Sequence, residues 1–268
     1  MKIRNKDFEV DKHTYICAIL NVTPDSFSDG GEAFSEAEAV EKAKRLIAEG
    51  ADLLDIGGES TRPGFVEVDP DEEIRRVVPV IRKIRSFSQI PISVDTRKSK
   101  VALSAFEAGA DIINDVSGLR FDPDMARVIA ESGAYCCLMH DGQYFDKKAD
   151  YITGVTGDLA SIAKDALDAG IAPDRIILDP GVGFGKDAGE NVLVIRELKR
   201  FSTLGYPVLL GCSRKSVIGA VTGLKVDERL EGTLATTAMA VLTGTAFVRV
   251  HDVKENARFV TMMEALCR

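Results

Sequence analysis

Short apolar runs alternate with longer amphipathic segments along the whole chain. Eight of these runs are rich in β-branched residues and are bounded by Gly, Pro, Asp or Asn, which is the pattern of buried strands. They cover residues 15–20, 52–56, 90–94, 111–114, 134–138, 175–178, 207–210 and 246–250. The pattern therefore predicts eight strands with helices between them.

The segment after the first run shows the clearest helical pattern. Ser35 and Glu38 have the spacing of a capping box, and apolar residues recur at intervals of three and four between residues 40 and 47. Gly50 then stands where a helix commonly ends. The same glycine ending recurs at Gly109, Gly133 and Gly170. We therefore predict a helix at 35–49 and a repeated strand–helix unit.

Eight strand–helix units in about 250 residues are typical of a (β/α)8 barrel, the single-domain α/β fold of the TIM type. A doubly wound open sheet is the alternative architecture. Residues 1–13 precede the first unit, and we expect them to form a short lid or hairpin over the bottom of the barrel. The predicted organisation is thus an N-terminal extension at 1–13 and a barrel at 14–268.

Composition narrows the class of protein. The chain has 268 residues and is 45% hydrophobic, which supports a large core and argues against disorder. Its net charge of −8 argues against nonspecific nucleic-acid binding, although a local basic cluster can still hold an anionic substrate.

The cysteines and the apolar stretches bear on the compartment. Five cysteines without a C-x-x-C spacing argue against a disulfide framework or a structural zinc site. Four of them lie in apolar runs and are read as small core residues: Cys17, Cys136, Cys137 and Cys212. No leader-like segment and no apolar stretch of about 20 residues is present, so we expect a reduced, cytoplasmic protein without a membrane partner.

Polar side chains gather at the ends of the predicted strands, where a (β/α)8 barrel builds its active site. Four of them are hydrogen-bond acceptors or amides on the second, third, fourth and sixth strands: Asp55, Asp95, Asn114 and Asp179. Each alone would fit a helix cap, but polar residues at all eight strand ends make capping an insufficient account. The four suit a flat heterocycle that is rich in N–H donors.

The last two strands end in basic and hydroxyl residues, at the place where barrels commonly hold phosphate. These residues are Ser213, Lys215, Ser216, Arg249 and His251. On the first strand, Asn21 offers an amide oxygen that suits a Mg²⁺ ion carrying phosphate oxygens and water. The residues alone therefore indicate a barrel enzyme for a phosphorylated, donor-rich ring.

Other signals are weaker. The glycine-rich stretch at 181–186 matches neither the dinucleotide fingerprint nor the P-loop. His140 fits a packed histidine at a strand end, and His13 fits a surface residue. No H-E-x-x-H or comparable cluster indicates zinc.

Seven motifs follow one another from about residue 15 to the C-terminus. They are ILNVTPDSFSDGG at 19–31, DIGGESTRPG at 55–64, SVDTRK at 93–98, INDVSGL at 113–119, LDPGVGFGK at 178–186, SRKSVIG at 213–219 and RVHDV at 249–253. In this order they closely resemble the motifs of the dihydropteroate synthase family of folate biosynthesis, whose pterin-binding fold is a (β/α)8 barrel. The resemblance implies a transferase that joins 6-hydroxymethyl-7,8-dihydropterin diphosphate to p-aminobenzoate, giving 7,8-dihydropteroate and diphosphate. It also implies Mg²⁺, a homodimer and inhibition by sulfonamides.

The resemblance assigns expected roles to individual residues. The pterin would be held by Asp55, Asp95, Asn114, Asp179, Lys215 and Arg249, with Arg249 stacked on its face. The diphosphate would be held by Asn21, Thr61, Arg62, Arg249 and His251, with Mg²⁺ at Asn21. The p-aminobenzoate pocket would be formed by Phe27, Thr61, Pro63, Phe184, Lys215 and Ser216.

The expected catalytic residues are Asp95, Lys215 and Asn21. Asp95, taken as ionised, would stabilise positive charge on the pterin methylene in an S_N1-like reaction, while Mg²⁺ and cationic side chains stabilise the leaving diphosphate. The amphipathic segments 229–243 and 254–266 are candidates for the dimer contact or simply pack on the barrel.

Three other functions remain open from the sequence. A pterin-binding methyltransferase that serves a corrinoid would share the acidic pocket, but it has no need for the basic SRKS and RVH motifs. A non-catalytic pterin-binding barrel would have no need for the full set of polar residues. A structural or interaction protein is disfavoured because the chain shows no repeat, stripe or tail for such a role.

Overall fold

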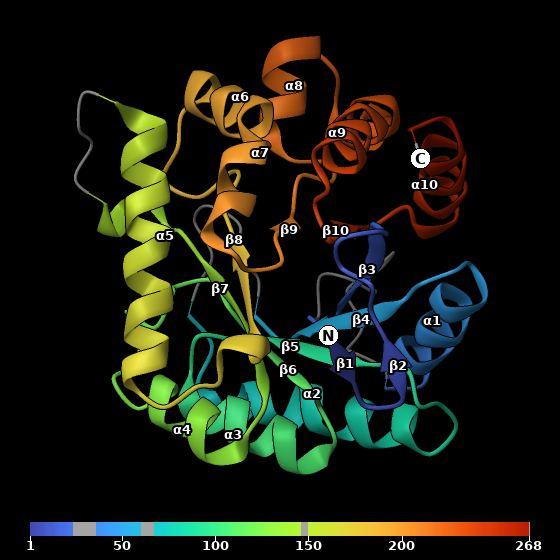
Figure 1. Cartoon of the computed structure of the whole chain (residues 1–268). Coiled ribbons are helices and arrows are strands. Elements are labelled where there is room, and N and C mark those ends of the chain that lie inside the picture. Colours follow the sequence, from blue (N-terminus) through green and yellow to red (C-terminus); the bar gives the residue numbers. More distant parts are fainter. Residues whose placement is uncertain (24–35, 60–66, 146–149, 268) are drawn as a thin grey trace.

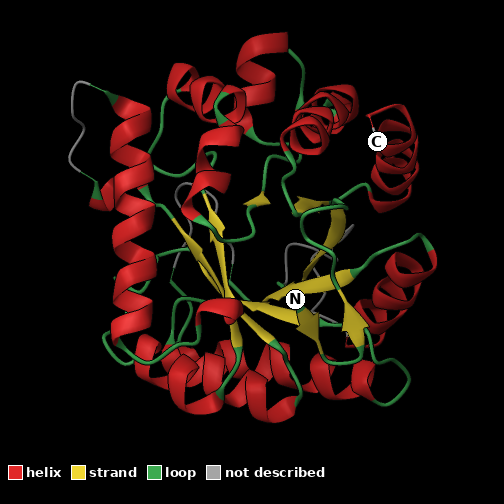
Figure 2. Cartoon of the chain, in the orientation of Figure 1, coloured by secondary structure: helices red, strands yellow, loops and turns green. Residues whose placement is uncertain are grey.

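Eight parallel strands form one sheet that curves around a common axis, and helices surround it (Figures 1 and 2). The computed structural model describes residues 1–23, 36–59, 67–145 and 150–267. The strands are β3 (Tyr15–Asn21), β4 (Leu53–Gly57), β5 (Ile92–Asp95), β6 (Ile112–Asp115), β7 (Tyr135–Met139), β8 (Ile176–Asp179), β9 (Leu209–Leu210) and β10 (Phe247–Val250). Their order in the sheet is β8-β7-β6-β5-β4-β3-β10-β9.

A parallel bridge between Leu178 and Val208 joins the two ends of this order and closes the barrel. The predicted (β/α)8 fold is confirmed, and the open sheet is excluded. Each observed strand begins and ends within two residues of its predicted run.

The α-helices lie on the outside of the barrel. They are α1 (Glu36–Ala48), α2 (Pro70–Arg85), α3 (Ser99–Ala108), α4 (Met125–Ser132), α5 (Tyr151–Asp168), α6 (Ala188–Arg196), α7 (Leu198–Phe201), α8 (Ser216–Thr222), α9 (Leu230–Thr243) and α10 (Val253–Cys267). The short 3-10 helices are η2 (Gly142–Tyr144), η3 (Pro173–Arg175), η4 (Ser202–Leu204) and η5 (Val226–Glu228). The predicted helix at 35–49 is α1, while the Ser35 capping box lies outside the described residues.

Alternation along each strand sorts the side chains into two sets, because successive residues of a strand point to opposite faces. One set, such as Leu54 and Ile56 on β4, faces the helices and belongs to the main apolar core. The other faces the barrel axis. At the amino ends of the strands this inner set is apolar, with Cys17, Leu53 and Phe247 among its members.

Residues 2–7 form the expected hairpin, with β1 (Lys2–Ile3) antiparallel to β2 (Lys6–Asp7). Ile3 and Phe8 are buried in the inner apolar cluster, so the hairpin covers the amino ends of the strands (Figure 1). With that end filled, the polar inner side chains lie towards the opposite, carboxyl end of the strands.

The four cysteines expected in the core are buried, and Cys267 is exposed. None of the helices in the described ranges combines the length and the apolar character that a membrane crossing requires.

Candidate active site

The inner face of the barrel carries polar side chains at the carboxyl ends of six strands. They are Asn21 on β3, Asp55 on β4, Asp95 on β5, Asn114 on β6, Asp179 on β8 and Arg249 on β10. Strand register places Asn21, Gly57, Asp95 and Asn114 side by side in one row. The structure thus brings together the acceptor residues that the sequence assigned to separate strands.

Arg249 connects the two carboxylates of this group. Its Nε donates to Asp55 Oδ2 at 2.5 Å, and its Nη2 donates to Asp95 Oδ2 at 2.6 Å. The amide of Asn114 also donates to Asp55, at 3.3 Å. Burial opposes the charge of Arg249, but the two carboxylates raise the pKa of its guanidinium above the ordinary value. The guanidinium therefore stays charged in the barrel and presents N–H donors to the acceptors expected to bind the pterin.

Asp95 is buried and has a shifted ionisation. Burial raises its pKa to about 7; Arg249 opposes this shift, and the nearby Asp55 and Glu73 add to it. The mechanism predicted from the sequence requires an ionised Asp95, whereas this pKa leaves the carboxyl partly protonated near neutral pH. Within the part of the chain that the structure describes, Asp95 Oδ1 is buried and has no hydrogen-bond partner. Such an atom is costly unless a ligand donates to it.

Lys215 and Asp179 lie together, next to Arg249. A Cβ atom at Gly211 would lie 3.7 Å from Asp179 Oδ2 and 3.7 Å from Lys215 Nζ, so both groups border the space that this glycine leaves. Burial raises the pKa of Asp179 and lowers that of Lys215. The Lys215 ammonium also donates to the carbonyl of Val182 and lies 4.6 Å from the centre of the Phe184 ring. Lys215 thereby links the predicted pterin pocket to Phe184.

The loop that carries Phe184 is held by Lys186, to which the sequence motifs assign no role. Its ammonium donates to the carbonyls of Gly181 at 2.8 Å and Phe184 at 3.1 Å, and it lies 2.9 Å from His140 Nδ1. Burial lowers the pKa of Lys186 to about 8, and burial together with Lys186 lowers that of His140 to about 4. His140 is thus a packed, neutral histidine that accepts from Lys186. The feature of the sequence that could have identified Lys186 is its position as a lysine at the end of the glycine-rich stretch 181–186.

Basic side chains and Asp252 lie near His251. Ser213 Oγ lies 3.0 Å from His251 Nδ1, and Arg214 pairs with Asp252 beside them. Burial lowers the pKa of His251 to about 4, with further lowering by Arg249, Arg214 and Lys42. Burial is thus the main reason why His251 is neutral, and the cations near it are basic groups gathered in a chain of net charge −8.

The remaining predicted residues are placed only in part. Ser216 is the first residue of α8 and is exposed, directly after Lys215. Asn21 Oδ1 would lie 3.6 Å, and Asp95 Oδ2 3.9 Å, from a Cβ atom at Gly57, so both oxygens border the space that this glycine leaves. Four predicted residues lie outside the described residues: Phe27, Thr61, Arg62 and Pro63.

A (β/α)8 barrel with acidic and amide side chains beside basic ones at the carboxyl ends of its strands fits an enzyme for a phosphorylated heterocycle. The family model of pterin binding enzymes matches residues 17–251. A dihydropteroate synthase of Clostridium beijerinckii is 48% identical over 269 residues, covering 100% of both chains. A dihydropteroate synthase of Bacillus subtilis is 49% identical over 253 residues, covering 94% of this chain and 88% of that one. The chain therefore belongs to the pterin-binding enzymes and, within them, to the dihydropteroate synthases, which are transferases.

Solved structures agree with this assignment. A Clostridium difficile dihydropteroate synthase, studied in the presence of pteroic acid, has a TM-score of 0.89 and 47% identity, covering 98% of this chain and 100% of that one. A Xanthomonas albilineans enzyme with 4-aminobenzoic acid has a TM-score of 0.91 and 42% identity, with coverages of 96% and 94%. A Yersinia pestis enzyme in a sulfonamide complex has a TM-score of 0.92 and 36% identity, with coverages of 99% and 98%.

Proposed function

We propose that this chain condenses 6-hydroxymethyl-7,8-dihydropterin diphosphate with p-aminobenzoate to give 7,8-dihydropteroate and diphosphate. The observation that carries the proposal is the buried acceptor Asp95 Oδ1, which lacks a donor within the described ranges and lies in the same barrel as the basic side chains near His251. The ligands named for the similar solved structures, which are pteroic acid and 4-aminobenzoic acid, support the same reaction.

The pterin pocket is proposed to lie among the inner residues of the barrel. The pyrimidine edge of a pterin offers N–H donors, and Asp95, Asn114 and Asp179 offer the matching acceptors. Asp55 and Arg249 border the same space. Because Arg249 already donates to Asp55 and Asp95, the pterin has to share or replace these contacts when it binds.

The diphosphate is proposed to bind between Arg249 and His251, with Thr61, Arg62 and Asn21 as further contacts. The cations around His251 supply the attraction for an anion. Mg²⁺ is proposed to bind at Asn21, because its hard amide oxygen and a carboxylate oxygen of Asp95 both lie near Gly57, and Mg²⁺ is commonly held by one or two protein oxygens together with substrate phosphates. When bound, Mg²⁺ neutralises negative charge on the leaving diphosphate.

The p-aminobenzoate is proposed to lie against Phe184 and Lys215, near the hydroxyl of Ser216, with Phe27, Thr61 and Pro63 completing the pocket. Lys186 donates to the carbonyls of Gly181 and of Phe184 itself and so fixes this wall of the pocket. A sulfonamide presents a similar aniline ring, so we expect it to compete for the same place, as the complex of the Yersinia pestis enzyme suggests.

The chemical step is proposed to be S_N1-like. As diphosphate leaves, positive charge develops on the pterin methylene, and the ionised form of Asp95 stabilises it. Arg249 and His251 stabilise the departing negative charge. The aniline nitrogen is a weak nucleophile, so a strongly electrophilic carbon favours its attack.

The direct test mixes the purified chain with Mg²⁺ and both substrates and measures dihydropteroate by mass together with diphosphate release. Formation of both products is expected. Diphosphate release without dihydropteroate would contradict the proposed p-aminobenzoate site, and binding of the pterin without either product would contradict the proposed reaction.

The rate should depend on the ionisation of Asp95. Its pKa of about 7 means that the carboxylate form dominates only above neutral pH, so kcat/KM for the pterin substrate should rise as pH increases through about 7 and then level off. Initial rates between pH 5.5 and 9 in buffers of constant ionic strength measure this profile. A flat profile down to about pH 5 would contradict a role for the Asp95 carboxylate in the free enzyme.

A homodimer is proposed on the face formed by the last helices. Exposed apolar side chains there include Val221, Val226, Leu242, Met262 and Leu266. Sedimentation should give twice the 29.0 kDa of the chain, and Leu242→Asp should shift the protein towards monomer, because a charge in an apolar contact is poorly solvated.

The matched control for this dimer is Leu103→Asp on α3, which changes an exposed leucine outside the proposed face and should leave the dimer intact. If both variants had the same oligomeric state, this face would not be the dimer contact.

We also propose that the protein is located in the cytoplasm.

A further inference from the structure

The turn between β9 and α8 contains a residue in an unusual backbone conformation, Arg214. Its φ is 58°, in the left-handed region that glycine adopts easily and other residues adopt at a cost in free energy. The backbone N–H of Lys215 donates to the carbonyl of Cys212 at 3.1 Å, so Arg214 is the third residue of a four-residue turn. Glycine is common where this position is left-handed. The arginine therefore needs an explanation in the contacts that it makes.

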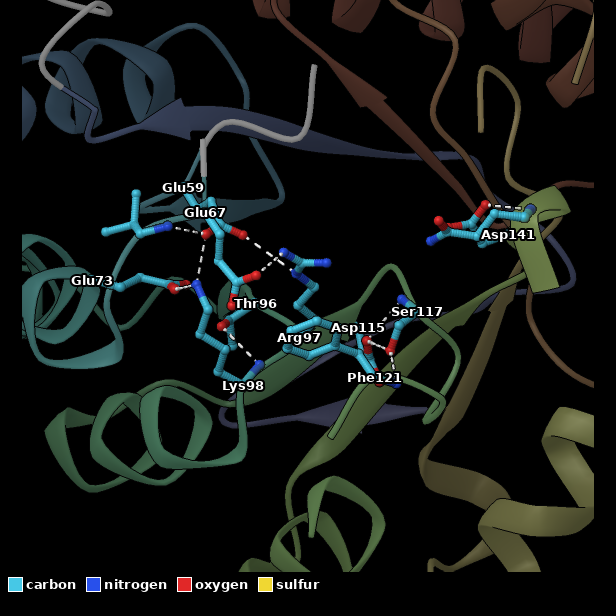
Figure 3. A network of polar contacts seen from close by, with 12 residues as sticks. Glu59, Glu67, Glu73, Thr96, Arg97, Lys98, Asp115, Ser117, Phe121 and Asp141 are labelled. Atoms are coloured by element: carbon cyan, nitrogen blue, oxygen red, sulfur yellow. Dashed lines mark hydrogen bonds and ion pairs between the residues drawn. The ribbon is translucent and has the colours of Figure 1, made fainter. Parts of the chain in front are cut away.

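The described ranges contain two other non-glycine residues with positive φ, and local structure accounts for both. Arg4 lies in the tight turn between β1 and β2, a hairpin turn of the kind that commonly requires positive φ. Leu119 is held within its own loop, where its backbone N–H donates to Asp115 at 2.8 Å. Asp115 also accepts from Ser117 of that loop (Figure 3). The conformation of Arg214, in contrast, is maintained by partners from other elements.

The guanidinium of Arg214 forms a forked ion pair with Asp252. Its Nε donates to Asp252 Oδ2 at 3.0 Å, and its Nη2 donates to Asp252 Oδ1. Asp252 directly follows His251 in the loop after β10. Arg214 lies between Ser213 and Lys215 in the loop after β9. One ion pair thus joins the two loops that carry residues proposed to bind the diphosphate and p-aminobenzoate.

Two further contacts fix the backbone of Arg214 against α9. Its N–H donates to the hydroxyl of Thr233 at 3.1 Å, and its carbonyl accepts from Arg229 Nη1 at 3.0 Å. Thr233 is buried. The side chain and both polar backbone groups of Arg214 are therefore attached to neighbouring elements, which fixes the direction in which the chain enters Lys215.

The residues on both sides of Arg214 contact other parts of the proposed site. Ser213 Oγ accepts from the backbone N–H of His251 at 3.2 Å and lies 3.0 Å from its ring Nδ1. Lys215 Nζ lies 4.6 Å from the centre of the Phe184 ring. A shift of the turn would therefore move the hydroxyl beside His251 and the ammonium beside Phe184 together.

Stability alone is a poor explanation for an arginine in this turn. The side chain of Arg214 is 39% exposed, and ion pairs with such access to water contribute little to stability. The left-handed conformation opposes that contribution, and glycine would remove the strain. A guanidinium, unlike glycine, provides a planar fork that fixes the distance between the two loops. Asp252 also balances the charge of Arg214, which makes this residue a weak attractor for an anion.

We propose that Arg214 is a positioning residue, which uses its forked pair with Asp252 to hold its two neighbours in the proposed site. Ser213 is thereby kept beside His251, and Lys215 is kept at the p-aminobenzoate pocket. The affinities for the diphosphate group and for p-aminobenzoate then depend on Arg214 without a contact between Arg214 and either ligand. The inference rests on the proposed function, which assigns these ligands to His251 and Lys215.

The main experiment compares Arg214→Gly with Arg214→Ala. Both remove the guanidinium, but only glycine adopts the left-handed conformation without strain. We expect KM for p-aminobenzoate and for the pterin diphosphate to rise about 10-fold in both variants, the effect of one lost hydrogen bond to a charged group. Tm should stay within about 2 °C for Arg214→Gly and fall by about 2–4 °C for Arg214→Ala. Fewer folded molecules would lower kcat and leave KM unchanged, so a rise in KM at a normal Tm identifies positioning.

Asp252→Asn distinguishes positioning from direct binding of a ligand by Arg214. Asn keeps the shape of Asp252 but weakens the fork, so both KM values should rise as in Arg214→Gly. The double variant should show no further rise, because the two substitutions break the same contact. If Arg214 bound the diphosphate directly, Asp252→Asn would free the guanidinium, and KM for the pterin diphosphate would fall or stay the same. That result would overturn the proposal.

Arg120→Ala is the matched control. Arg120 forms a similar fork with Asp158, at 2.5 Å and 3.0 Å, which joins the loop after β6 to α5. Because Arg120 is less exposed than Arg214, at 24% against 39%, its loss in Tm should be at least as large. Both KM values should stay within about 2-fold, since neither Arg120 nor Asp158 has a role in the proposed site. A rise equal to that of Arg214→Ala would speak against positioning by Arg214.

Nuclear magnetic resonance follows the contact to His251 without turnover. The chain has three histidines, so the ring signals of His251 can be assigned. In Arg214→Gly these signals should shift, because Ser213 is no longer held beside Nδ1, while the signals of His13 and His140 stay unchanged. Arg214→Asn, which also tolerates the left-handed conformation, replaces the glycine variant if that variant does not fold.

Normal KM values in Arg214→Gly, or unshifted signals of His251, would overturn the positioning role. KM values that rise only in Arg214→Ala would do the same, because the role would then be purely structural. An unsubstituted protein that forms no dihydropteroate would overturn the proposed function, and this inference with it. The activity of the unsubstituted chain therefore distinguishes the two failures.

Discussion

Replacement of Asp95 by Asn should lower kcat by about 10²–10³-fold, the loss expected when a preorganised group opposite developing charge is removed. Asn keeps the shape of Asp95 and can still accept from Arg249, but it has no negative charge to stabilise the pterin methylene cation. Single-turnover rates at saturating substrate measure the chemical step directly. The rise of kcat/KM through about pH 7 should also disappear, because the group with this pKa has been removed.

Asp115→Asn is the matched control for this substitution. Asp115 is also a buried carboxylate at the end of a strand, and burial raises its pKa. Asp115, however, accepts hydrogen bonds from Ser117 and Leu119 of its own loop, at 2.7–2.8 Å. A loss of stability with a nearly normal kcat is expected. A kcat for Asp95→Asn that equals that of Asp115→Asn would remove Asp95 from the chemical step.

The barrel could be predicted from the sequence because each of its units is encoded locally. Buried parallel strands are continuous apolar runs, and glycine ends the helices, so eight repeats suffice to define the fold. The inner position of Asp55, Asp95 and Arg249 follows from the same local rule, since alternate residues of a strand share a face. The side chains that face the barrel axis could thus be predicted once the ends of the strands were known.

The contacts between those side chains were not predictable, because they join distant parts of the chain. Arg249 meets Asp55 across 194 positions of sequence, and no local pattern shows that it bridges two carboxylates. The same holds for the contact between Lys186 and His140, which are 46 positions apart in the sequence. The pKa of Asp95 was also missed, since it depends on how deeply the carboxyl is buried and on the balance between Arg249 and its acidic neighbours.

The substitution Arg249→Met tests the bridge from Arg249 to Asp55 and Asp95, and we expect it to lower both stability and activity strongly. The substitution leaves Asp55 and Asp95 buried without their cation, and removal of one partner from a buried ion pair destabilises by about 3–5 kcal/mol. It also removes a cation from the proposed diphosphate site, so kcat/KM should fall by about 10²–10³-fold. Urea denaturation and initial rates measure the two effects on the same preparation.

The dependence on pH identifies the physical origin of that loss. Arg249 lowers the pKa of Asp95, so its removal should raise this pKa further above the value in the unfolded chain. A carboxyl whose pKa is raised by folding binds its proton more tightly in the folded state, so stability falls as pH rises from the unfolded towards the folded pKa. The loss in free energy of unfolding caused by Arg249→Met should therefore be larger at pH 8 than at pH 5.

Arg249→Lys provides the control for this substitution. Lys keeps the positive charge but lacks the planar fork that donates to two carboxylates at once. We expect most of the stability at pH 8 to return, because a cation again faces the carboxylates, while kcat/KM recovers only in part. If the Arg249→Met and Arg249→Lys variants had the same free energy of unfolding at both pH values, the charge of Arg249 would not be what stabilises the pocket. The side chain would then stabilise the protein through its packing against Asp55 and Asp95 alone.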